Sequence, residues 1–341
     1  MAPGASLDAR RPAAVTTLAG TARQSGSSDG AGALGRFQRP MGIALAADGT
    51  LYVADTDNHT IRRVTPAGVV TTLAGAAGAK GSNDGQGGAA RFNHPVGIAV
   101  AADGMLYITD ADNHTIRKVT PAGEVTTLAG QVGRKGGADG AGRTAAFYTP
   151  HGIAVGSDGT VYVSDTENHT LRRISAAGEV GTLAGAAGQK GSTDGSGSAA
   201  RFFHPAGLAL DATGTLYVAD NGNHTVRKVL PAGTVTTLAG QPGRSGSADG
   251  PASAARFDWP NGVSVDAQGV VYVTDCANAT VRRISPAGEV STLAGRVHGW
   301  GYQDGAGPDA RFEVPLGIAV EASGATVFVT DAKNQLIRCI R

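Results

Sequence analysis

Three histidines stand beside prolines in the middle of the chain, and this set of residues could serve metal chemistry. His94 and His204 each precede a proline, and His151 follows one. Three neutral imidazoles with one open coordination position form the ligand set of catalytic zinc sites. Asp258 and Glu313 lie two residues before later prolines, and either carboxylate could act as a general base there. These residues define one candidate site, a metal-dependent enzyme that holds zinc or calcium.

A second group of residues has the composition of a contact surface rather than of a catalytic centre. Both tryptophans of the chain fall in segments that we predict to be loops. Trp and Tyr are common anchors in binding surfaces, and polar neighbours give such anchors specificity. The predicted contact residues are Arg39, Tyr148, Asp258, Trp259, Asn261, His298, Trp300 and Tyr302. This group predicts binding of a protein, a peptide, a sugar or a small molecule, without a cofactor.

Both groups occupy variable positions within a strict internal repeat. The tetrapeptide Thr-Leu-Ala-Gly begins at residues 17, 72, 127, 182, 237 and 292, in steps of 55 residues. An Asp-Gly pair, a proline and a later aspartate follow in each unit. The last interval between those aspartates, Asp275 to Asp331, is 56 residues, which indicates one inserted residue near Ala325. Self-similarity at a fixed period of this length predicts an architecture of repeated units.

Each unit has the pattern of four short antiparallel strands. In the first unit, the apolar residues 42–46 are followed by an Asp-Gly turn and by an alternating strand at 51–55. A polar turn leads into strand 60–64, and a Pro-Ala-Gly turn leads into strand 69–73. Hairpin-linked strands in six such units predict an all-β fold, a six-bladed β-propeller with four strands in each blade.

The two ends of the chain predict how the ring closes. Residues 15–20 form a fourth strand with no blade before it, and the chain ends on a third strand with no fourth after it. The N-terminal strand is therefore predicted to pair with the C-terminal blade and leave no open edge. The predicted division is an N-terminal extension (1–14) and one propeller (15–341), with the outer strand of blade 6 at 15–20, blades 1 to 5 at about 40–75, 95–130, 150–185, 205–240 and 260–295, and blade 6 at 315–341.

These motifs resemble the NHL-repeat family. The family's run Pro-x-Gly-Ile-Ala-Val is matched at residues 95–100, its Tyr-Val-Ala-Asp at 107–110, and its Asn-His before Ile-Arg at 113–117. The resemblance covers residues 15–341 and implies the propeller fold. It leaves the function open, because NHL propellers range from protein- and RNA-binding modules through sensor domains to a metal-dependent lyase. That lyase, with its histidine-bound metal, implies a lyase or hydrolase type of reaction for the histidine site described above.

Residues that recur in every unit are interpreted as scaffold. We expect the repeated aspartate, such as Asp110, to hold its turn by side-chain hydrogen bonds rather than to bind metal. The Asn-His pair of the first four units is predicted to be packed and hydrogen bonded. An arginine precedes a phenylalanine in five units, and we expect it to pair with the loop aspartate of its own unit, as Arg91 with Asp84. In the third unit Arg143 could replace it.

The composition argues against several classes of function. The formal net charge is +1 and charged residues make up 17% of the chain, which argues against a nucleic-acid partner and a membrane partner. No apolar run approaches the roughly 20 residues of a membrane span. The opening residues lack the apolar core of a signal peptide, so we expect a cytoplasmic chain by default, or an exported chain without its signal. A monomer is expected, and Cys276 and Cys339 are expected to be free thiols.

The variable positions surround the predicted channel, where the first strand of each blade begins. Folding alone gives no reason for equivalent positions of a repeat to carry such different side chains, although loops also vary without a function. The sequence therefore favours a non-catalytic binding or interaction scaffold that uses the loop-rich face around the central channel. The alternative is the metal-dependent enzyme with His94, His151 and His204 as ligands at the channel mouth.

Overall fold

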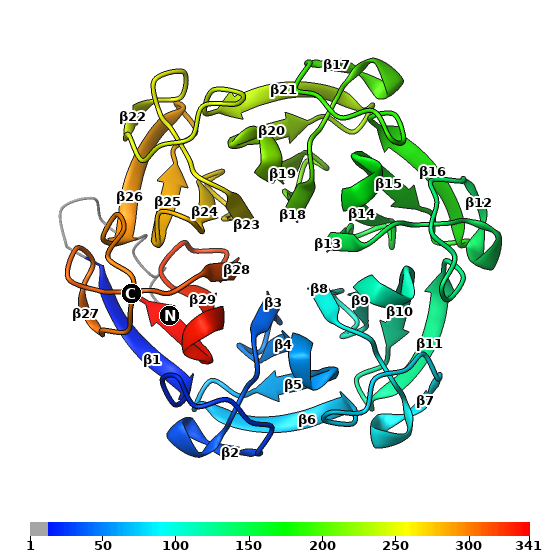
Figure 1. The fold of residues 1–341 in the computed structure, drawn as a ribbon, viewed down its shortest axis with the longest axis horizontal. Coiled ribbons are helices and arrows are strands. Elements are labelled where there is room, and N and C mark those ends of the chain that lie inside the picture. The colour runs from blue at the N-terminus through cyan, green and yellow to red at the C-terminus, as the bar shows by residue number, and fades with distance from the viewer. Residues whose placement is uncertain (1–12) are drawn as a thin grey trace.

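The computed structural model describes residues 13–341 as six β-sheets arranged around a central channel (Figure 1). Successive sheets follow one another along the chain, from blade 1 in blue to blade 6 in orange and red. Within residues 13–341 every regular element is a β-strand or a single-turn 3-10 helix. In this part of the chain no helix is long and apolar enough to cross a membrane. The six-bladed propeller predicted from the repeat is confirmed.

Each blade contains five antiparallel strands rather than the four predicted. In blade 1 the order from the rim to the channel is β2 (Gly30–Ala31), β6 (Val69–Gly75), β5 (Thr60–Val64), β4 (Leu51–Asp55) and β3 (Pro40–Leu45). The additional strand β2 is only two residues long and follows the Asp of the Asp-Gly pair. It pairs with β6, with Gly30 opposite Val70, and so covers an outer edge that would otherwise stay unpaired.

The other blades repeat this plan. Their inner strands, which line the channel, are β8 (Pro95–Val100), β13 (Pro150–Val155), β18 (Pro205–Leu210), β23 (Pro260–Val265) and β28 (Pro315–Val320). The second strands are β9 (Leu106–Asp110), β14 (Val161–Asp165), β19 (Leu216–Asp220), β24 (Val271–Asp275) and β29 (Val327–Asp331). The third strands are β10 (Thr115–Val119), β15 (Thr170–Ile174), β20 (Thr225–Val229), β25 (Thr280–Ile284) and β30 (Leu336–Ile340).

The outer parts of these blades follow the same order. The outer strands are β11 (Glu124–Ala129), β16 (Glu179–Ala184), β21 (Thr234–Ala239), β26 (Glu289–Gly295) and, in blade 6, β1 (Ala14–Gly20). The edge strands are β7 (Gly85–Gln86), β12 (Gly140–Ala141), β17 (Gly195–Ser196), β22 (Gly250–Pro251) and β27 (Gly305–Ala306). Short 3-10 helices follow the edge strands at η1 (Gly32–Leu34), η3 (Gly87–Ala89), η5 (Gly142–Thr144) and η7 (Gly197–Ala199), and follow the second strands at η2 (Thr56–Asn58), η4 (Ala111–Asn113), η6 (Thr166–Asn168), η8 (Asn221–Asn223) and η9 (Ala332–Asn334).

The N-terminal strand closes the ring, as predicted. β1 pairs antiparallel with β30, with Val15 opposite Ile340, and on its other side with the edge strand β27. The backbone N–H of Ala14 donates to the carbonyl oxygen of Arg341 at 2.7 Å, and the N–H of Arg341 donates to the carbonyl oxygen of Ala14 at 2.9 Å. Blade 6 is therefore built from segments at both ends of the described chain, the dark blue and the red segments in Figure 1.

The hydrophobic core lies between neighbouring blades. Ala54 and Ile61 of blade 1 belong to one cluster with Ile98 and Ile108 of blade 2. Alternate residues of a strand face opposite sides of its sheet, so each blade presents one apolar side to each neighbour. A phenylalanine at the end of each long loop is fully buried in this layer, namely Phe37, Phe92, Phe147, Phe202, Phe257 and Phe312. The blades thus hold one another in place, which fixes the inner strands around the channel.

Neighbouring inner strands approach one another closely at one glycine per blade. A side chain at Gly97 would overlap the carbonyl oxygen of His151 in the next blade. The same overlap with the next blade would occur at Gly42, Gly152, Gly207, Gly262 and Gly317. Only glycine lets the two backbones lie this close together. This contact explains the repeated Pro-x-Gly motif and keeps the channel narrow.

A buried arginine joins the distant parts of each blade. In blade 2 the fully buried Arg117 donates from Nη1 to Asp110 Oδ2 at 2.7 Å and from Nη2 to Asp84 Oδ1 at 2.8 Å. Its Nη1 also donates to the backbone carbonyl oxygen of Arg91 at 2.9 Å. Equivalent arginines with both carboxylate contacts are Arg62, Arg172, Arg227, Arg282 and Arg338. The network ties the long loop, the second strand and the third strand of each blade together.

This network corrects the predicted pairing of Arg91 with Asp84. Arg91 donates instead to backbone carbonyl oxygens of its own loop, and Asp84 is held by Arg117. Arg143, suggested as a replacement in the third unit, contacts Asp84 of the preceding blade at 3.3 Å. The loop folds back over its blade, so the aspartate meets the third strand rather than the arginine that is closer in sequence.

The repeated aspartate holds the turn after the second strand, as predicted. Asp110 accepts hydrogen bonds from the backbone N–H of Asn93 and from Nδ2 of Asn113, each at 2.7 Å. Burial raises the pKa of Asp110 to about 6, and the positive charge of Arg117 opposes that rise. The carboxylate is therefore ionised at neutral pH and is fully occupied by scaffold contacts.

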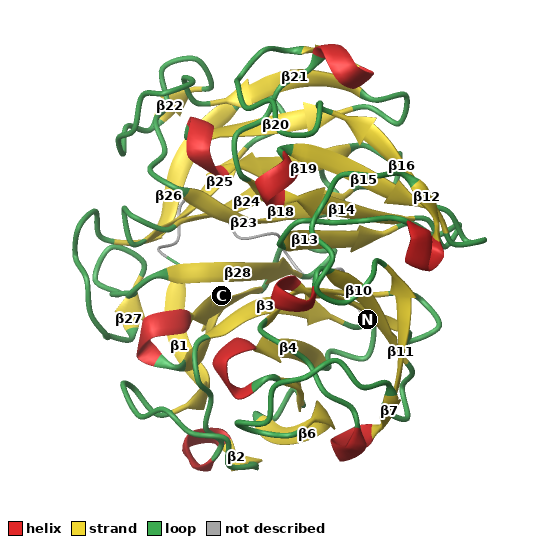
Figure 2. Ribbon diagram, turned by 45° about the vertical axis from the view of Figure 1, so that its right-hand side comes forward, coloured by secondary structure: helices red, strands yellow, loops and turns green. Residues whose placement is uncertain are grey.

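The channel opens on two chemically different faces. Figure 2 shows the 3-10 helices in red and the loops in green that join the yellow strands. One end, which we call the histidine face, is formed by the two residues before each inner-strand proline, at 38–39, 93–94, 148–149, 203–204, 258–259 and 313–314. The other end, the hairpin face, carries the turns between inner and second strands. In blade 6 this turn is one residue longer than in blade 1. The N–H of Glu321 donates to the carbonyl oxygen of Thr326, five residues on, whereas the N–H of Ala46 donates to that of Thr50, four residues on.

Candidate binding site at the channel mouth

The residue before each inner-strand proline has the same unusual backbone conformation in all six blades. Its φ angle is positive at Arg39 (52°), His94 (50°), Thr149 (49°), His204 (48°), Trp259 (54°) and Val314 (61°). A left-handed conformation is uncommon for any residue except glycine, and it is least expected for a β-branched one. Because side chains of five different types share it, the conformation is imposed by the repeat. It turns these side chains onto the histidine face whatever their chemical type.

A hydrogen bond from the preceding blade holds this backbone. The N–H of His94 donates to Nδ1 of His59 at 3.2 Å, and the N–H of Thr149 donates to Nδ1 of His114 at 3.2 Å. The same contact, which we call the interblade latch, joins the N–H of His204 to Nδ1 of His169 and the N–H of Trp259 to Nδ1 of His224, and Nδ1 of His169 also lies 3.0 Å from the carbonyl oxygen of Thr166. The histidine of each Asn-His pair is thus packed and hydrogen bonded, as predicted.

The latch needs a neutral histidine, because a protonated ring nitrogen cannot accept a hydrogen bond. Burial lowers the pKa of all four latch histidines, His59, His114, His169 and His224, and so favours the neutral form. Gln335 replaces the imidazole between blades 6 and 1, where its Oε1 accepts from the N–H of Arg39 at 2.6 Å. Between blades 5 and 6 the equivalent residue is Ala279, whose side chain has no acceptor to offer.

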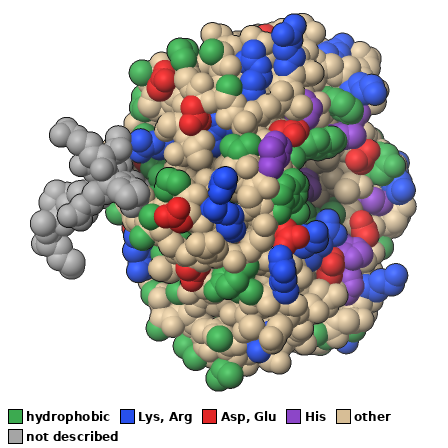
Figure 3. Space-filling model, turned by 60° about the vertical axis from the view of Figure 1, so that its left-hand side comes forward, with side chains coloured by type: hydrophobic (Ala, Val, Ile, Leu, Met, Phe, Trp, Pro, Cys, Tyr) green, Lys and Arg blue, Asp and Glu red, His purple; other side chains and the backbone are tan. Residues whose placement is uncertain are grey.

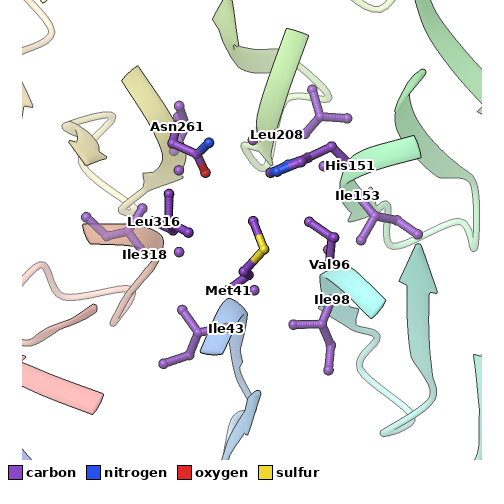
Figure 4. Close-up of a pocket in the computed structure, with 17 residues that line it drawn as sticks. Met41, Ile43, Val96, Ile98, His151, Ile153, Leu208, Asn261, Leu316 and Ile318 are labelled. Atoms are coloured by element: carbon purple, nitrogen blue, oxygen red, sulfur yellow. The ribbon is translucent and has the colours of Figure 1, made fainter. Parts of the chain in front are cut away.

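The residues that follow the prolines form the narrow mouth of the channel. We call them the mouth ring, which consists of Met41, Val96, His151, Ala206, Asn261 and Leu316. All of these except Ala206 line a cavity of about 60 Å³, together with apolar residues of the inner strands (Figure 4). His151 from β13 and Asn261 from β23 extend polar groups into this cavity. The mouth is therefore an apolar collar with two polar side chains.

The backbone of the mouth ring is fixed by hydrogen bonds between neighbouring blades. Oγ1 of Thr109 accepts a hydrogen bond from the N–H of Gly97 at 2.6 Å and donates to the carbonyl oxygen of His151 at 2.7 Å. Burial, with a smaller contribution from the positive charge of Arg39, lowers the pKa of the His151 imidazole to about 4. His151 keeps some exposure to the channel and is neutral at neutral pH. Its ring can donate one hydrogen bond and accept another.

The three histidines predicted as metal ligands lie in different surroundings. His94 Nδ1 is 2.6 Å from Asp112 and its Nε2 is 3.8 Å from Asp57, while His204 Nε2 is 3.6 Å from Glu167. Only His151 lines the mouth cavity. Within residues 13–341 no group of three His, Cys, Asp or Glu side chains is placed to hold a metal ion. The left-handed backbone before the proline separates His94 and His204 from His151, which follows its proline.

The two carboxylates named as general bases differ in their contacts. Glu313 binds Lys333 at 2.8 Å and Arg23 at 3.2 Å, and the hydrogen bond from Lys333 is the main cause that lowers its pKa. Asp258 lies 3.5 Å from Nδ1 of the latch residue His224. Glu313 is therefore ion-paired, and Asp258 lies beside a latch histidine.

The predicted contact residues near the channel lie together on the histidine face. Figure 3 shows histidine and charged side chains gathered around a hollow on this side of the molecule. Arg39 is 3.6 Å from Asp57, and the Tyr148 ring lies under Lys135 Nζ at 4.9 Å. The Trp259 side chain is 47% exposed, although its ring touches His224 edge-on. Asn261 lies two residues further, inside the mouth ring. Five of the eight predicted residues thus surround the mouth.

The other three predicted contact residues lie on the loop between β26 and β27, at the rim of blade 6. The side chains of Trp300 and Tyr302 are 49% and 44% exposed, and His298 is exposed as well. The Tyr302 ring lies 5.3 Å from the guanidinium of Arg338 and lines an outer groove with residues of β1 and η1. The structure therefore divides the predicted set into a mouth group and a rim group.

The opposite end of the channel is wider and carries acidic side chains. A cavity of about 750 Å³ opens there and includes Asp211, Asp266 and Glu321 of blades 4, 5 and 6. The Asp266 carboxylate accepts hydrogen bonds from two backbone N–H groups of its own turn and from the Tyr272 hydroxyl. Asp211 is bound in the same way within its turn. The aspartates of the hairpin face thus stabilise turns.

Comparison with known families now assigns the repeat. The model of the NHL repeat matches residues 37–64, 92–119, 147–174, 202–229 and 257–284. The chain belongs to the NHL-repeat β-propeller family. Each match ends with the third strand and includes one residue of the mouth ring, the Asn-His pair or its equivalent, and the buried arginine of that blade.

Two curated relatives show how this NHL propeller occurs in longer proteins. The chain is 31% identical over 283 residues to the protein SUPPRESSOR OF QUENCHING 1, chloroplastic, of Arabidopsis thaliana, covering 78% of this chain and 26% of the relative. It is 30% identical over 296 residues to NHL repeat-containing protein 2 of Bos taurus, covering 75% of this chain and 40% of the relative. The propeller therefore spans less than half of either relative.

Solved structures share the fold of this NHL propeller at low identity. An auxiliary nutrient binding protein from Bacteroides thetaiotaomicron superimposes with a TM-score of 0.73 at 19% identity, covering 97% of this chain and 77% of the other. A streptogramin B lyase superimposes with a TM-score of 0.59 at 14% identity, covering 97% and 98%. At these identities the likeness concerns the fold alone, which serves both binding proteins and enzymes.

Two features of this NHL propeller were missed by reasoning from the sequence. The buried arginine recurs in all six units, and that recurrence alone marks it as the centre of the blade. The mouth ring is the position after each proline, where only His151 and Asn261 were predicted as site residues. Comparing that position across the six units would have shown four apolar residues and two polar ones.

Proposed function

We propose that this NHL propeller is a non-catalytic binding module whose ligand or partner contacts the histidine face around the channel mouth. The observation that carries this proposal is that six equivalent backbone positions, all left-handed, present Arg39, His94, Thr149, His204, Trp259 and Val314. The repeat fixes where these side chains stand but not what they are. A surface with a fixed backbone and unlike side chains is suited to recognition.

The physical character of the mouth supports binding rather than catalysis. The Glu313 carboxylate is ion-paired, His94 is paired with an acidic neighbour, and the latch imidazoles are engaged with backbone N–H groups. Trp259 offers an exposed aromatic ring at the edge of the collar. Such a ring is a strong anchor because it buries a large apolar area at a low cost in side-chain entropy. The fold likeness to a nutrient-binding protein agrees with this proposal.

The test uses the two tryptophans as reporters. Trp300→Phe leaves Trp259 as the one tryptophan, and Trp259→Phe leaves Trp300. A library of sugars, amino acids and short peptides is screened by fluorescence with both variants and with the parent protein. We expect ligands that shift the Trp259 signal, and we expect Trp259→Ala to weaken their binding by about tenfold or more.

The rim loop provides the matched control. Trp300→Ala should leave the binding of these ligands within about twofold if they occupy the mouth, since interface residues outside the centre contribute little. Ligands that shift only Trp300, or a bound structure with the ligand on the hairpin face, would contradict the proposal.

A further inference from the structure

The six blades can be compared at the mouth ring, because each blade places one residue at this structural position. Four blades place an apolar side chain there, namely Met41, Val96, Ala206 and Leu316, and these side chains are buried. The fold therefore has no need of a polar group at this position. His151 and Asn261 are the two exceptions, and they stand on blades 3 and 5, with blade 4 between them.

Neither polar side chain is used by the scaffold. In residues 13–341 the backbone carbonyl of His151 accepts from Thr109, but the imidazole makes no hydrogen bond to the protein, and neither does the Asn261 carboxamide. Both side chains are half-buried and keep some exposure to the channel, where their polar groups can hydrogen bond to water or to a ligand. The apolar side chains of the other four blades offer no such groups. Two unused polar groups that face one small cavity thus point to an external partner.

The cavity limits the size and the charge of that partner. Its volume of about 60 Å³ admits only a few water-sized groups, far less than the several hundred Å³ of a complete ligand pocket. One end of a ligand can enter, while the rest stays on the histidine face. The walls are apolar, His151 is neutral and none of the described lining residues carries a charge, so an ion would lose its hydration without a charged partner inside the cavity. A group that both donates and accepts hydrogen bonds would match an imidazole and a carboxamide.

We propose that His151 and Asn261 recognise one hydroxyl-bearing edge of an uncharged polyhydroxy compound, a sugar or a polyol. A hydroxyl group donates and accepts through a single heavy atom, so it suits this cavity better than a planar carboxamide does. Trp259 precedes Asn261 by two residues and presents its ring outside the collar, where the body of such a ligand would rest. This inference rests on the proposed function and names its ligand class and its two specificity residues.

The experiment replaces each polar residue by the residue of another blade. His151→Val reproduces Val96, and Asn261→Leu reproduces Leu316. Glucose, mannitol and glycerol serve as neutral probes, and gluconate and glucosamine serve as charged ones. The imidazole signals of His151 are followed by NMR and assigned by their loss in His151→Val. Leu230→Val is the matched control, since it changes an exposed apolar side chain at the turn after β20, away from the cavity.

We expect a neutral probe to shift the His151 signals and the charged probes to leave them in place. Both blade-swap variants should fold with an unchanged or higher melting temperature, and each should weaken binding by about tenfold, the effect of a lost hydrogen bond in a dry site. Leu230→Val should bind normally. Binding that survives both swaps, a preference for the charged probes, or no shift of His151 with any neutral probe would overturn the inference. If ligands of another class shift Trp259 but not His151, the proposed function stands and this inference fails.

Discussion

Arg117 and Val96 belong to the same blade, but their equivalents in the other blades behave in opposite ways. At the first position all six blades carry a buried arginine, bound to two carboxylates. At the second, in the mouth ring, the six side chains include aliphatic, thioether, imidazole and carboxamide groups. Both positions have a backbone fixed by neighbouring strands. The difference shows that folding determines the side chain where it must satisfy buried charges, and leaves it open where it faces the channel.

The largest loss of stability is expected when the closing strand β1 is removed. Deleting residues 1–20 removes β1, so β30 and β27 lose their partner and blade 6 keeps an unpaired edge. We expect aggregation or a sharp fall in the melting temperature, measured by calorimetry and size-exclusion chromatography. Monomeric elution with an unchanged melting curve would show that β1 does not hold the ring together.

The Asp–Arg network should respond strongly to a single substitution. Asp110→Ala leaves the Arg117 guanidinium buried without its main partner, which should lower the free energy of unfolding by about 3–5 kcal/mol. Asp112→Ala, which removes a half-exposed carboxylate two residues away, should cost less than about 1 kcal/mol. Urea unfolding measures both. Equal losses in the free energy of unfolding for the two variants would contradict the larger role given to the buried Asp–Arg network.

The interblade latch should have a smaller effect that depends on pH. Replacing His59, His114, His169 and His224 by alanine should cost about 1 kcal/mol for each latch, whereas glutamine, which serves as the natural latch at Gln335, should retain most of the stability. The alanine and glutamine variants are compared by urea unfolding at neutral pH. Larger losses with glutamine than with alanine would show that the Nδ1 contact is not the stabilising one.

The sign of the pH dependence follows from the lowered pKa of the latch histidines. Folding disfavours their protonation, so their contribution is complete above about 6.5, the pKa of an unfolded histidine, and declines as the pH falls below it. The raised pKa of the buried aspartates acts in the opposite direction on acidification. The difference between the parent protein and the four-glutamine variant cancels that second contribution. This difference should shrink at mildly acidic pH, and a constant difference would contradict the latch.

The fold was predictable because the same pattern of strand and turn residues occurs six times in the sequence. The Thr-Leu-Ala-Gly period and the turn residues set the blade number, and the unpaired strand at 15–20 set the closure. The fifth strand was missed, because two residues after an aspartate carry no periodic signal. The Asp84–Arg117 pair was also missed, since the two residues are 33 positions apart and only the folded loop brings them together.

The position of the candidate residues in the fold was predictable, but the direction of their side chains was not. Variable residues beside the prolines correctly marked one end of the channel, and five of the eight predicted contact residues lie there. Sequence reasoning grouped His94, His151 and His204 because all three adjoin prolines. It could not foresee that a left-handed residue precedes each proline, which turns His94 outward while His151 lines the cavity. It also could not separate the rim loop of Trp300 from the mouth.

The pairing of β1 with β30 affects how the number of blades in such a propeller can change during evolution. The chain enters the described propeller as an outer strand and leaves it as a third strand, so the boundary of the genetic unit is offset from the boundary of the blade. Duplication or loss of a whole 55-residue unit at any internal point would leave both terminal strands as they are. β1 and β30 could then close a propeller with a different number of blades, and the channel would become wider or narrower without any change in the closing strands.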